Sequence, residues 1–140
     1  MGVPFAPKVG DQGRVTWTVE QAHTADALGN PGVFVFATPM MLDLVEVACG
    51  AALAPSLPPD WVSLGTWVNL FHRRPTPLGM RVTAEATITA ADGPRVRFRV
   101  EVRDEVEMVG EAEHERYCLP RKEFEALVAK KQSRAAPSGS

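Results

Sequence analysis

Residues 38–53, TPMMLDLVEVACGAAL, decide the fold that this sequence predicts. Pro39 suits the first turn of a helix, where its missing N–H loses no hydrogen bond, and Thr38 is a residue type that caps helices. Prolines from Pro55 onward end the helix, because proline lacks a donor and clashes with the preceding turn. The expected helix runs from about residue 39 to 53. Its sides are apolar nearly all round, which is typical of a helix buried inside a molecule.

Glu46 interrupts this apolar helix near its middle. An ionised carboxylate buried without a partner costs several kcal/mol, so the sequence predicts either contact with water or a functional role. Asp43 lies one turn earlier and about 60° away around the helix axis, which allows both carboxylates to face one cavity. The helix dipole explains Asp43 structurally, because it stabilises negative charge near a helix N-terminus. Glu46 lies too far along the helix for that effect.

Alternating sequences around the helix predict strands. A first strand is expected over residues 14–20, followed by a loop or short helix over 21–32. Four further strands are expected over 61–73, 80–90, 95–103 and 107–119. The links between the last three are short enough for hairpins, which join antiparallel neighbours. A final helix is expected from residue 120 to 131, with Phe124, Leu127 and Val128 at helical spacing.

A buried helix followed by a meander of long antiparallel strands requires a sheet that curls around the helix. This is the outline of a hot-dog fold, an α+β fold in which a curled antiparallel β-sheet wraps a long central helix. We expect one such domain over residues 1–131 and a flexible tail over 132–140. The open sheet edge favours pairing with a second copy, so we expect a homodimer, with a dimer of dimers as an extension.

Composition narrows the possible partners and location. The formal net charge of -2 gives no overall attraction to nucleic acid or to anionic lipid. The strand RVRFRVEVR at 95–103 places its arginines on one face, and we interpret that face as the solvated outside of the sheet. The N-terminus lacks a signal-peptide pattern, and no apolar run approaches the roughly 20 residues of a membrane span. We therefore expect a cytoplasmic protein that binds neither membrane nor nucleic acid.

Four further residue types are considered for chemistry. Cys49 and Cys118 have neither metal-ligand spacing nor a disulfide framework, so both are interpreted as structural thiols. His72 ends a predicted strand and is compatible with either packing or catalysis. Gly65 lies inside the same strand, where glycine marks a bulge or the close approach of a ligand. Arg73 and Arg74 follow His72 as fork-shaped donors for the phosphates of a nucleotide.

Three stretches of the chain resemble the family of fluoroacetyl-coenzyme A thioesterases and their hot-dog relatives. They are FATPMMLDLVEVACGAALAP, SLGTWVNLFHRRPTPLGMRVTAE and GEAEHERYCLPRKEF, and the likeness covers most of residues 33–131. The resemblance implies that Thr38, Glu46 and His72 are catalytic. In this family Glu46 would attack the thioester or activate water, His72 would transfer protons, and Thr38 would orient the substrate or stabilise the oxyanion.

The resemblance also implies a substrate pocket, with one departure. Gly65 and Arg116 match positions associated with the acyl group. The family's lid phenylalanines align near Gly29 and Gly32, leaving Phe34 as the candidate substitute, so fluoroacetate specificity is not carried over.

The function predicted from the sequence is hydrolysis of a short or medium acyl-CoA to a free acid and CoA, without a metal or redox cofactor. One alternative is an acyl-CoA hydratase or dehydratase, whose paired Asp/His base Asp43 and His72 match loosely. The other is a non-catalytic acyl-CoA-binding or regulatory hot-dog module. Release of thiol from acyl-CoA separates the three, because a hydratase leaves the thioester intact and a binding module releases nothing.

Overall fold

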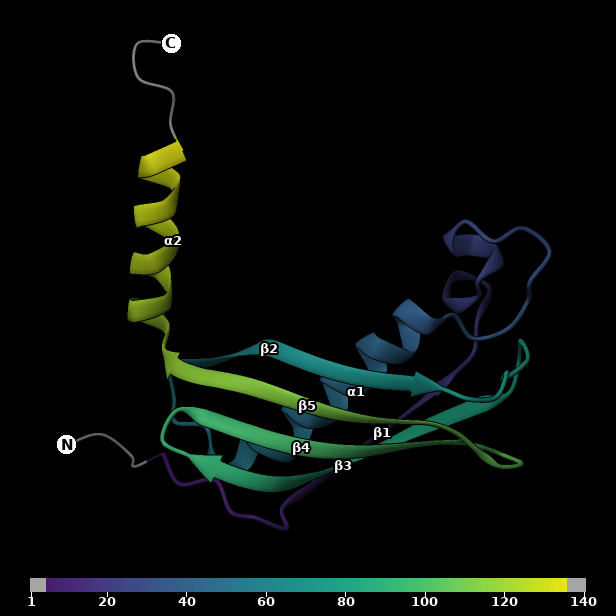
Figure 1. The fold of residues 1–140 in the computed structure, drawn as a ribbon, viewed down its shortest axis with the longest axis horizontal. Helices are drawn as coiled ribbons and strands as arrows, with labels where there is room; N and C mark the ends of the chain where they lie inside the picture. The colour runs from purple at the N-terminus through teal and green to yellow at the C-terminus, as the bar shows by residue number, and fades with distance from the viewer. Residues whose placement is uncertain (1–4, 136–140) are drawn as a thin grey trace.

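The structure is a computed structural model that describes residues 5–135, in which one antiparallel sheet curves over a long helix (Figure 1). The strands are β1 (Gln12–Thr18), β2 (Trp61–His72), β3 (Arg81–Asp92), β4 (Arg95–Asp104) and β5 (Met108–Pro120). The helices are α1 (Thr38–Leu53), α2 (Arg121–Ala135) and three short 3-10 turns, η1 (Gln21–His23), η2 (Asp26–Leu28) and η3 (Ala54–Ser56). The predicted α+β hot-dog architecture is confirmed.

The sheet has the strand order β1-β3-β4-β5-β2, and all neighbours are antiparallel. The predicted hairpins β3–β4 and β4–β5 are present, but the expected four-strand meander is wrong for β2, which pairs with β5 and not with β3. The segment between β2 and β3 carries Pro75 and Pro77, and its backbone pairs with the approach to α1 through Phe36 N to Thr76 O and Leu78 N to Phe34 O. β2 is therefore an edge strand.

The core lies between the sheet and one side of α1. The buried side chains of α1 pack against strand residues at every second position, because successive side chains of a strand point to opposite faces. The buried residues of α1 are Met41, Leu44, Val45, Ala48, Cys49, Ala52 and Leu53. β1 crosses α1 at Gly13, where an added Cβ would overlap the backbone of Ala48, Ala51 and Ala52. Glycine at this position sets how closely β1 and α1 pack.

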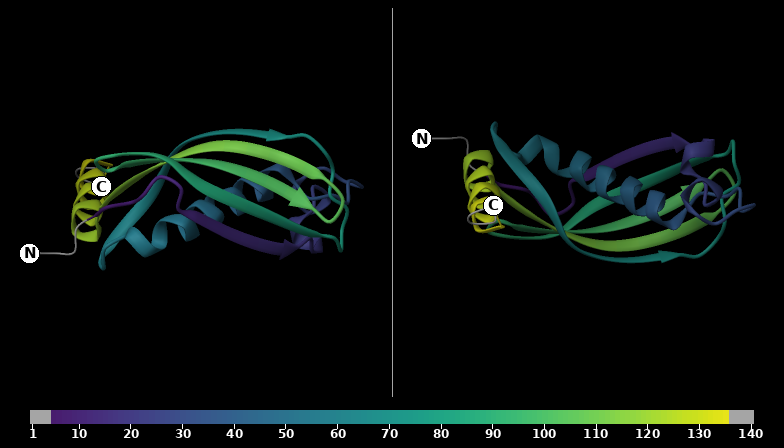
Figure 2. Two further views of the ribbon diagram at one scale, coloured as in Figure 1. Left: turned by 90° about the horizontal axis from the view of Figure 1, so that it is seen from below. Right: turned by 90° about the horizontal axis from the view of Figure 1, so that it is seen from above.

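The opposite side of α1 is open, which corrects the expectation of a helix buried all round. Pro39, Asp43, Val47 and Ala51 are exposed along one stripe of the helix. Figure 2 shows the physical reason: the sheet curves over α1 from one direction and leaves the other side uncovered. Among residues 5–135, Thr38–Ser56 is the one helical stretch with the length and apolarity of a membrane span, but in this fold it is the helix against which the sheet packs.

The outer face of the sheet is charged, as predicted for the arginine-rich strand β4. Arg95, Arg97, Arg99 and Arg103 are exposed, while Val96, Phe98, Val100 and Val102 between them are buried. Glu115 of β5 accepts hydrogen bonds from Arg95 and Arg97. These exposed ion pairs contribute little to stability individually, on the order of 0 to 1 kcal/mol. They provide a solvated surface opposite α1.

The last helix, α2, extends away from the rest of the molecule. In Figure 1 it leaves the end of β5 and passes beyond the β2 edge, away from the other strands. Its apolar residues Leu127 and Val128 are exposed and form an open groove with Phe124 and with Leu64 of β2. The helix continues through Ala135, so the tail predicted from residue 132 begins too early. The rest of that predicted tail, 136–140, lies outside the described residues.

Candidate active site

Thr38 and His72 form a hydrogen-bonded pair where α1 begins and β2 ends. Thr38 Oγ1 lies 2.8 Å from His72 Nδ1. The prediction that Thr38 caps the helix is wrong, because Ala37 is the N-cap residue and Thr38 is the first helical residue. The pairing of Phe36 with Thr76 holds the start of α1 against the chain that follows β2. The Thr38 hydroxyl is thereby directed to His72 instead of to the helix backbone.

Burial lowers the pKa of His72 below its usual value, and a backbone hydrogen bond with Arg74 opposes this effect only partly. His72 is therefore neutral at pH 7. A neutral imidazole can accept a proton at one nitrogen and donate one from the other, which is the property required of a proton-transfer residue.

Glu46 pairs with Arg116, which projects from β5 toward the helix. Arg116 Nη1 donates to Glu46 Oε2 at 3.3 Å. The Glu46 side chain is 41% exposed, whereas that of Arg116 is 13% exposed. Glu46 thus reaches solvent and also has a charged partner, which resolves the conflict of a carboxylate in an apolar helix.

Gly65 allows Glu46 to lie against the backbone of β2. A Cβ at this position would come within 2.7 Å of Glu46 Oε2 and 3.0 Å of His114 Cε1. The register of β2 against β5 shifts between Gly65 and Trp67, so the residue also marks a β-bulge. The bulge predicted at Gly65 is confirmed. The alternative, the close approach of a ligand, stays a prediction, and the group that lies against Gly65 in the structure is the Glu46 carboxylate.

His114 and Ser63 complete the surroundings of Arg116 and were missed as site residues by sequence reasoning. Arg116 Nε donates to Ser63 Oγ and Nη2 donates to the Ser63 carbonyl, both at 2.9 Å. Arg116 Nη1 lies 3.1 Å from His114 Nε2. The signal was present in the alternation of β5, where His114 and Arg116 share the inward face with Ala112. Glu111, Glu113 and Glu115 occupy the opposite, outward face of that strand.

Both cysteines are free and buried, and they behave as structural residues. Burial raises the pKa of Cys49 to about 12 and that of Cys118 to about 11. Neither thiol ionises appreciably at neutral pH, so neither is available as a nucleophile. The structural interpretation of these residues is supported.

The predicted catalytic residues lie in two separate clusters within one chain. The first is the Thr38–His72 pair, and the second contains Glu46 with Arg116, His114, Ser63 and Gly65. Thr38 and Glu46 are separated by roughly 12 Å along the axis of α1, at a rise of about 1.5 Å per residue. Asp43 is exposed and His72 bonds Thr38, so within one chain Asp43 and His72 do not form the pair that a hydratase would use.

The predicted substrate-binding residues on the surface have different surroundings. Arg73 donates to Glu111 and lies over the ring of Phe71, with 4.8 Å from its Cζ to the ring centroid. Arg74 approaches Glu107 only at 3.9 Å. Phe34 is exposed on the loop that leads to Thr38. Arg74 and Phe34 are accessible at the Thr38 end of the molecule, whereas Arg73 is already engaged.

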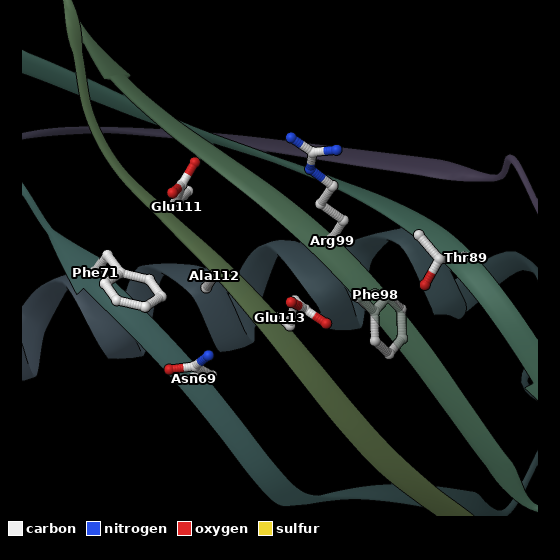
Figure 3. A pocket seen from close by; sticks show the side chains of 8 residues that line it. All are labelled: Asn69, Phe71, Thr89, Phe98, Arg99, Glu111, Ala112 and Glu113. Carbon is white, nitrogen blue, oxygen red and sulfur yellow. The ribbon is translucent and has the colours of Figure 1, made fainter.

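A hollow on the outer face of the sheet is lined by none of the residues of the two clusters (Figure 3). It is lined by Asn69, Phe71, Thr89, Phe98, Arg99, Glu111, Ala112 and Glu113. In Figure 3 the side chains of Arg99, Glu111 and Glu113 project in front of the strands while α1 runs behind them. Within residues 5–135, no three His, Cys, Asp or Glu side chains are grouped to hold a metal ion.

Comparison with known proteins places the chain among thioesterases. The family model for fluoroacetyl-CoA-specific thioesterase matches residues 19–122. The fluoroacetyl-CoA thioesterase of Streptantibioticus cattleyicolor is 40% identical over 97 residues, which cover 69% of this chain and 70% of that protein.

Solved structures agree with this assignment. A thioesterase superfamily member from Thermus thermophilus has a TM-score of 0.86 at 28% identity and covers 92% of this chain and 96% of its own. A variant of the fluoroacetyl-CoA thioesterase in complex with acetyl-CoA has a TM-score of 0.82 at 34% identity, covering 89% and 98%.

Proposed function

Since the chain belongs to the fluoroacetyl-CoA-specific thioesterase family and is an acyl-CoA thioesterase, we propose that it hydrolyses CoA thioesters of short or medium acyl groups at Glu46. The observation that carries this proposal is the half-exposed Glu46 carboxylate, held by Arg116 against the backbone at Gly65. A carboxylate in this position is oriented by a cation yet accessible to a substrate.

Glu46 can act in either of two ways. As a general base, it takes a proton from water while the water oxygen bonds to the thioester carbon and the C–S bond breaks. As a nucleophile, it bonds to that carbon itself, CoA leaves as the thiolate, and water then hydrolyses the resulting anhydride. In both routes the thiolate of CoA takes up a proton, which His72 can relay, and the products are a free acid and CoA. Water, a carboxylate and a histidine balance the reaction, so we propose no metal or redox cofactor.

The complete site requires a second copy of the chain. Residues 65–69 of β2 are all exposed, and this group includes Trp67 at 42% and Val68 at 37%. An edge strand of this kind is a template for pairing with another strand. We propose a homodimer in which β2 pairs antiparallel with β2 of the second copy about a two-fold axis close to Val68 and Asn69.

This axis lies midway along β2 between Gly65 and His72. The two-fold therefore brings His72 and Thr38 of one copy next to Gly65 and Glu46 of the other, which closes the separation found within one chain. The open stripe of α1, including Val47, lies at the same interface. Two equivalent sites result, each built from both copies.

Arg74 is accessible at the Thr38 end of the molecule, and this supports a binding position there for the nucleotide of CoA. We propose that Arg74, assisted by Arg73, binds the phosphates of the nucleotide, because guanidinium groups bind phosphate in a forked geometry. Arg73 must exchange its contact with Glu111 for this role. If both are replaced by Ala, KM should rise more for acyl-CoA than for the matching pantetheine thioester. Equal changes for the two substrates would exclude these residues from the CoA site.

Thiol release across acyl-CoAs of graded length and polarity tests the proposed activity, with Glu46→Gln as the decisive variant. This change keeps the shape of the side chain but removes its charge, so kcat should fall by at least about a hundredfold while the fold is retained. The matched control is Glu85→Gln, which makes the same change at an exposed glutamate on β3 and should retain wild-type kcat. Near-normal kcat for Glu46→Gln on the best substrate would show that Glu46 is structural.

A further inference from the structure

The imidazole of His114 is held between two partners of different chemistry. The side chain is almost completely buried, with 2% of the residue exposed. Its Nδ1 lies 2.7 Å from the carbonyl oxygen of Trp67, the residue at the β2 bulge. Its Nε2 lies 3.1 Å from Arg116 Nη1. His114 therefore connects the bulge in β2 to the arginine that contacts Glu46.

These two partners determine the protonation of the ring. A carbonyl oxygen can only accept a hydrogen bond, so Nδ1 must carry a proton and donate it to Trp67. A guanidinium can only donate, so Nε2 must be unprotonated and accept from Arg116. The neutral ring with its proton on Nδ1 satisfies both contacts. A doubly protonated ring would direct an N–H at the guanidinium of Arg116.

The surroundings of His114 favour this neutral form. Burial lowers the pKa of His114, and the charge of Arg116 lowers it further, against opposing contributions from the Trp67 carbonyl, Glu46 and Glu115. The ring of Phe98 on β4 packs at 6.1 Å between centroids. The charged groups around His114 are thus Arg116 and Glu115 of β5 and Glu46 of α1.

Three residues hydrogen-bond the guanidinium of Arg116, and His114 is one of them. Ser63 accepts from Nε and Nη2 along one edge of the guanidinium. Nη1 remains, and it is shared between His114 Nε2 and Glu46 Oε2. Without an acceptor at Nε2, a buried donor loses its partner, and the group would rotate to recover a hydrogen bond elsewhere.

We propose that His114 is a positioning residue for thioester hydrolysis: by accepting from Arg116 Nη1 it fixes the guanidinium in the orientation that holds the Glu46 carboxylate. This inference rests on the proposed function, in which Glu46 performs the hydrolytic step. His114 itself faces α1 from β5 with 2% of the residue exposed, so in this proposal it acts through Arg116 and not by contact with the substrate.

Two substitutions distinguish the hydrogen bond of His114 to the Trp67 carbonyl from its hydrogen bond with Arg116. In His114→Gln, the side-chain carbonyl reaches the place of Nε2 and can still accept from Arg116. In His114→Asn, the shorter amide reaches the place of Nδ1 and can donate to the Trp67 carbonyl. It provides no hydrogen-bond acceptor for Arg116 Nη1. We expect His114→Gln to retain kcat within a few-fold. His114→Asn should lower kcat by about tenfold to a hundredfold, as misplacing a reacting group by about 1 Å does.

The coupling to Arg116 gives the second measurement. If His114 acts through the guanidinium, His114→Asn should cause no further loss of kcat in an Arg116→Met background, because residues of one network are non-additive. Melting temperatures of all variants establish that they are folded. Equal loss of kcat in the Gln and Asn variants, or an undiminished effect of His114→Asn in the Arg116→Met background, would overturn the proposal.

A spectroscopic measurement is independent of turnover. Long-range 1H–15N NMR spectra of the wild type should show His114 as the neutral tautomer with its proton on Nδ1, and Arg116→Met should shift the Nε2 resonance. A proton on Nε2 in the wild type would exclude the acceptor role. If the wild type released no thiol from any acyl-CoA, the proposed function would fail, while this spectrum would still decide whether His114 accepts from Arg116.

Discussion

Histidines 72 and 114 are both partly or fully buried, and burial lowers the pKa of each below 6.5. Neutral imidazoles suit both contacts that the structure shows, the Thr38 hydroxyl for His72 and the Arg116 guanidinium for His114. The same burial links these residues to the pH dependence of folding.

We expect the melting temperature to fall as the pH decreases below about 6.5. Above that pH the two histidines are neutral in both the folded and the unfolded chain. Below it the unfolded chain binds protons that the folded chain resists, so protonation favours unfolding until the lowered folded-state pKa values are passed. Thermal melting between pH 7.5 and 5.5 measures this. His114→Gln removes one of the two groups and should give a shallower decline, and an equally steep decline in that variant would contradict the assignment.

At the scale of elements, β1 crosses α1 at Gly13, where an added Cβ would lie 2.2 Å from Ala52 N. Gly13→Ala should lower the melting temperature strongly, because its Cβ would meet helix backbone that cannot rotate away. Overpacking of this kind costs about 1 to 3 kcal/mol or more. Gly50→Ala is the control: its Cβ meets nothing within 4 Å, and alanine should stabilise the middle of a helix by about 0.5 to 1 kcal/mol. Equal melting temperatures for the two variants would show that β1 adjusts freely.

The elements were largely predictable from local pattern. The ends of α1 follow from Pro39 and Pro55, and the β3, β4 and β5 boundaries differ from expectation by at most two residues. The first strand begins and ends two residues earlier than expected: Gln12 and Gly13 already pair with Thr87 and Ala86 of β3, and the strand ends at Thr18. Periodicity shows which residues share a face, but the partner of β2 depends on how the chain crosses the sheet, which a local pattern does not contain.

The candidate site was predictable to a lesser degree. Glu46 and Gly65 broke the local pattern and could be identified, and the structure brings them together. Alternation along β5 places His114 on the inward face, but it does not show the role of His114, which depends on the Trp67 carbonyl and on a bulge in another strand. The same limit applies to Thr38, whose sequence signal as a helix cap is outweighed by a tertiary contact with His72.

At the scale of the whole molecule, the proposed dimer has a test that depends on which copy supplies each residue. Glu46→Gln and His72→Ala each inactivate both sites of their own homodimer. A heterodimer of the two, co-expressed with different tags and purified through both, should recover about half of wild-type activity, because one site then combines the intact Glu46 with the intact His72. A heterodimer as inactive as its parents would show that each chain builds its site alone.

The two buried thiols can also be used to measure local opening of the folded protein. Because Cys49 and Cys118 are shielded and protonated in the folded chain, a thiol reagent can react with them only when the layer between α1 and β5 separates. The rate of thiol labelling therefore measures how often the layer between α1 and β5 opens, without an engineered probe. Cys49 follows Glu46 by less than one helical turn, so its rate reports openings at the carboxylate itself and should slow when an acyl-CoA analogue occupies the site.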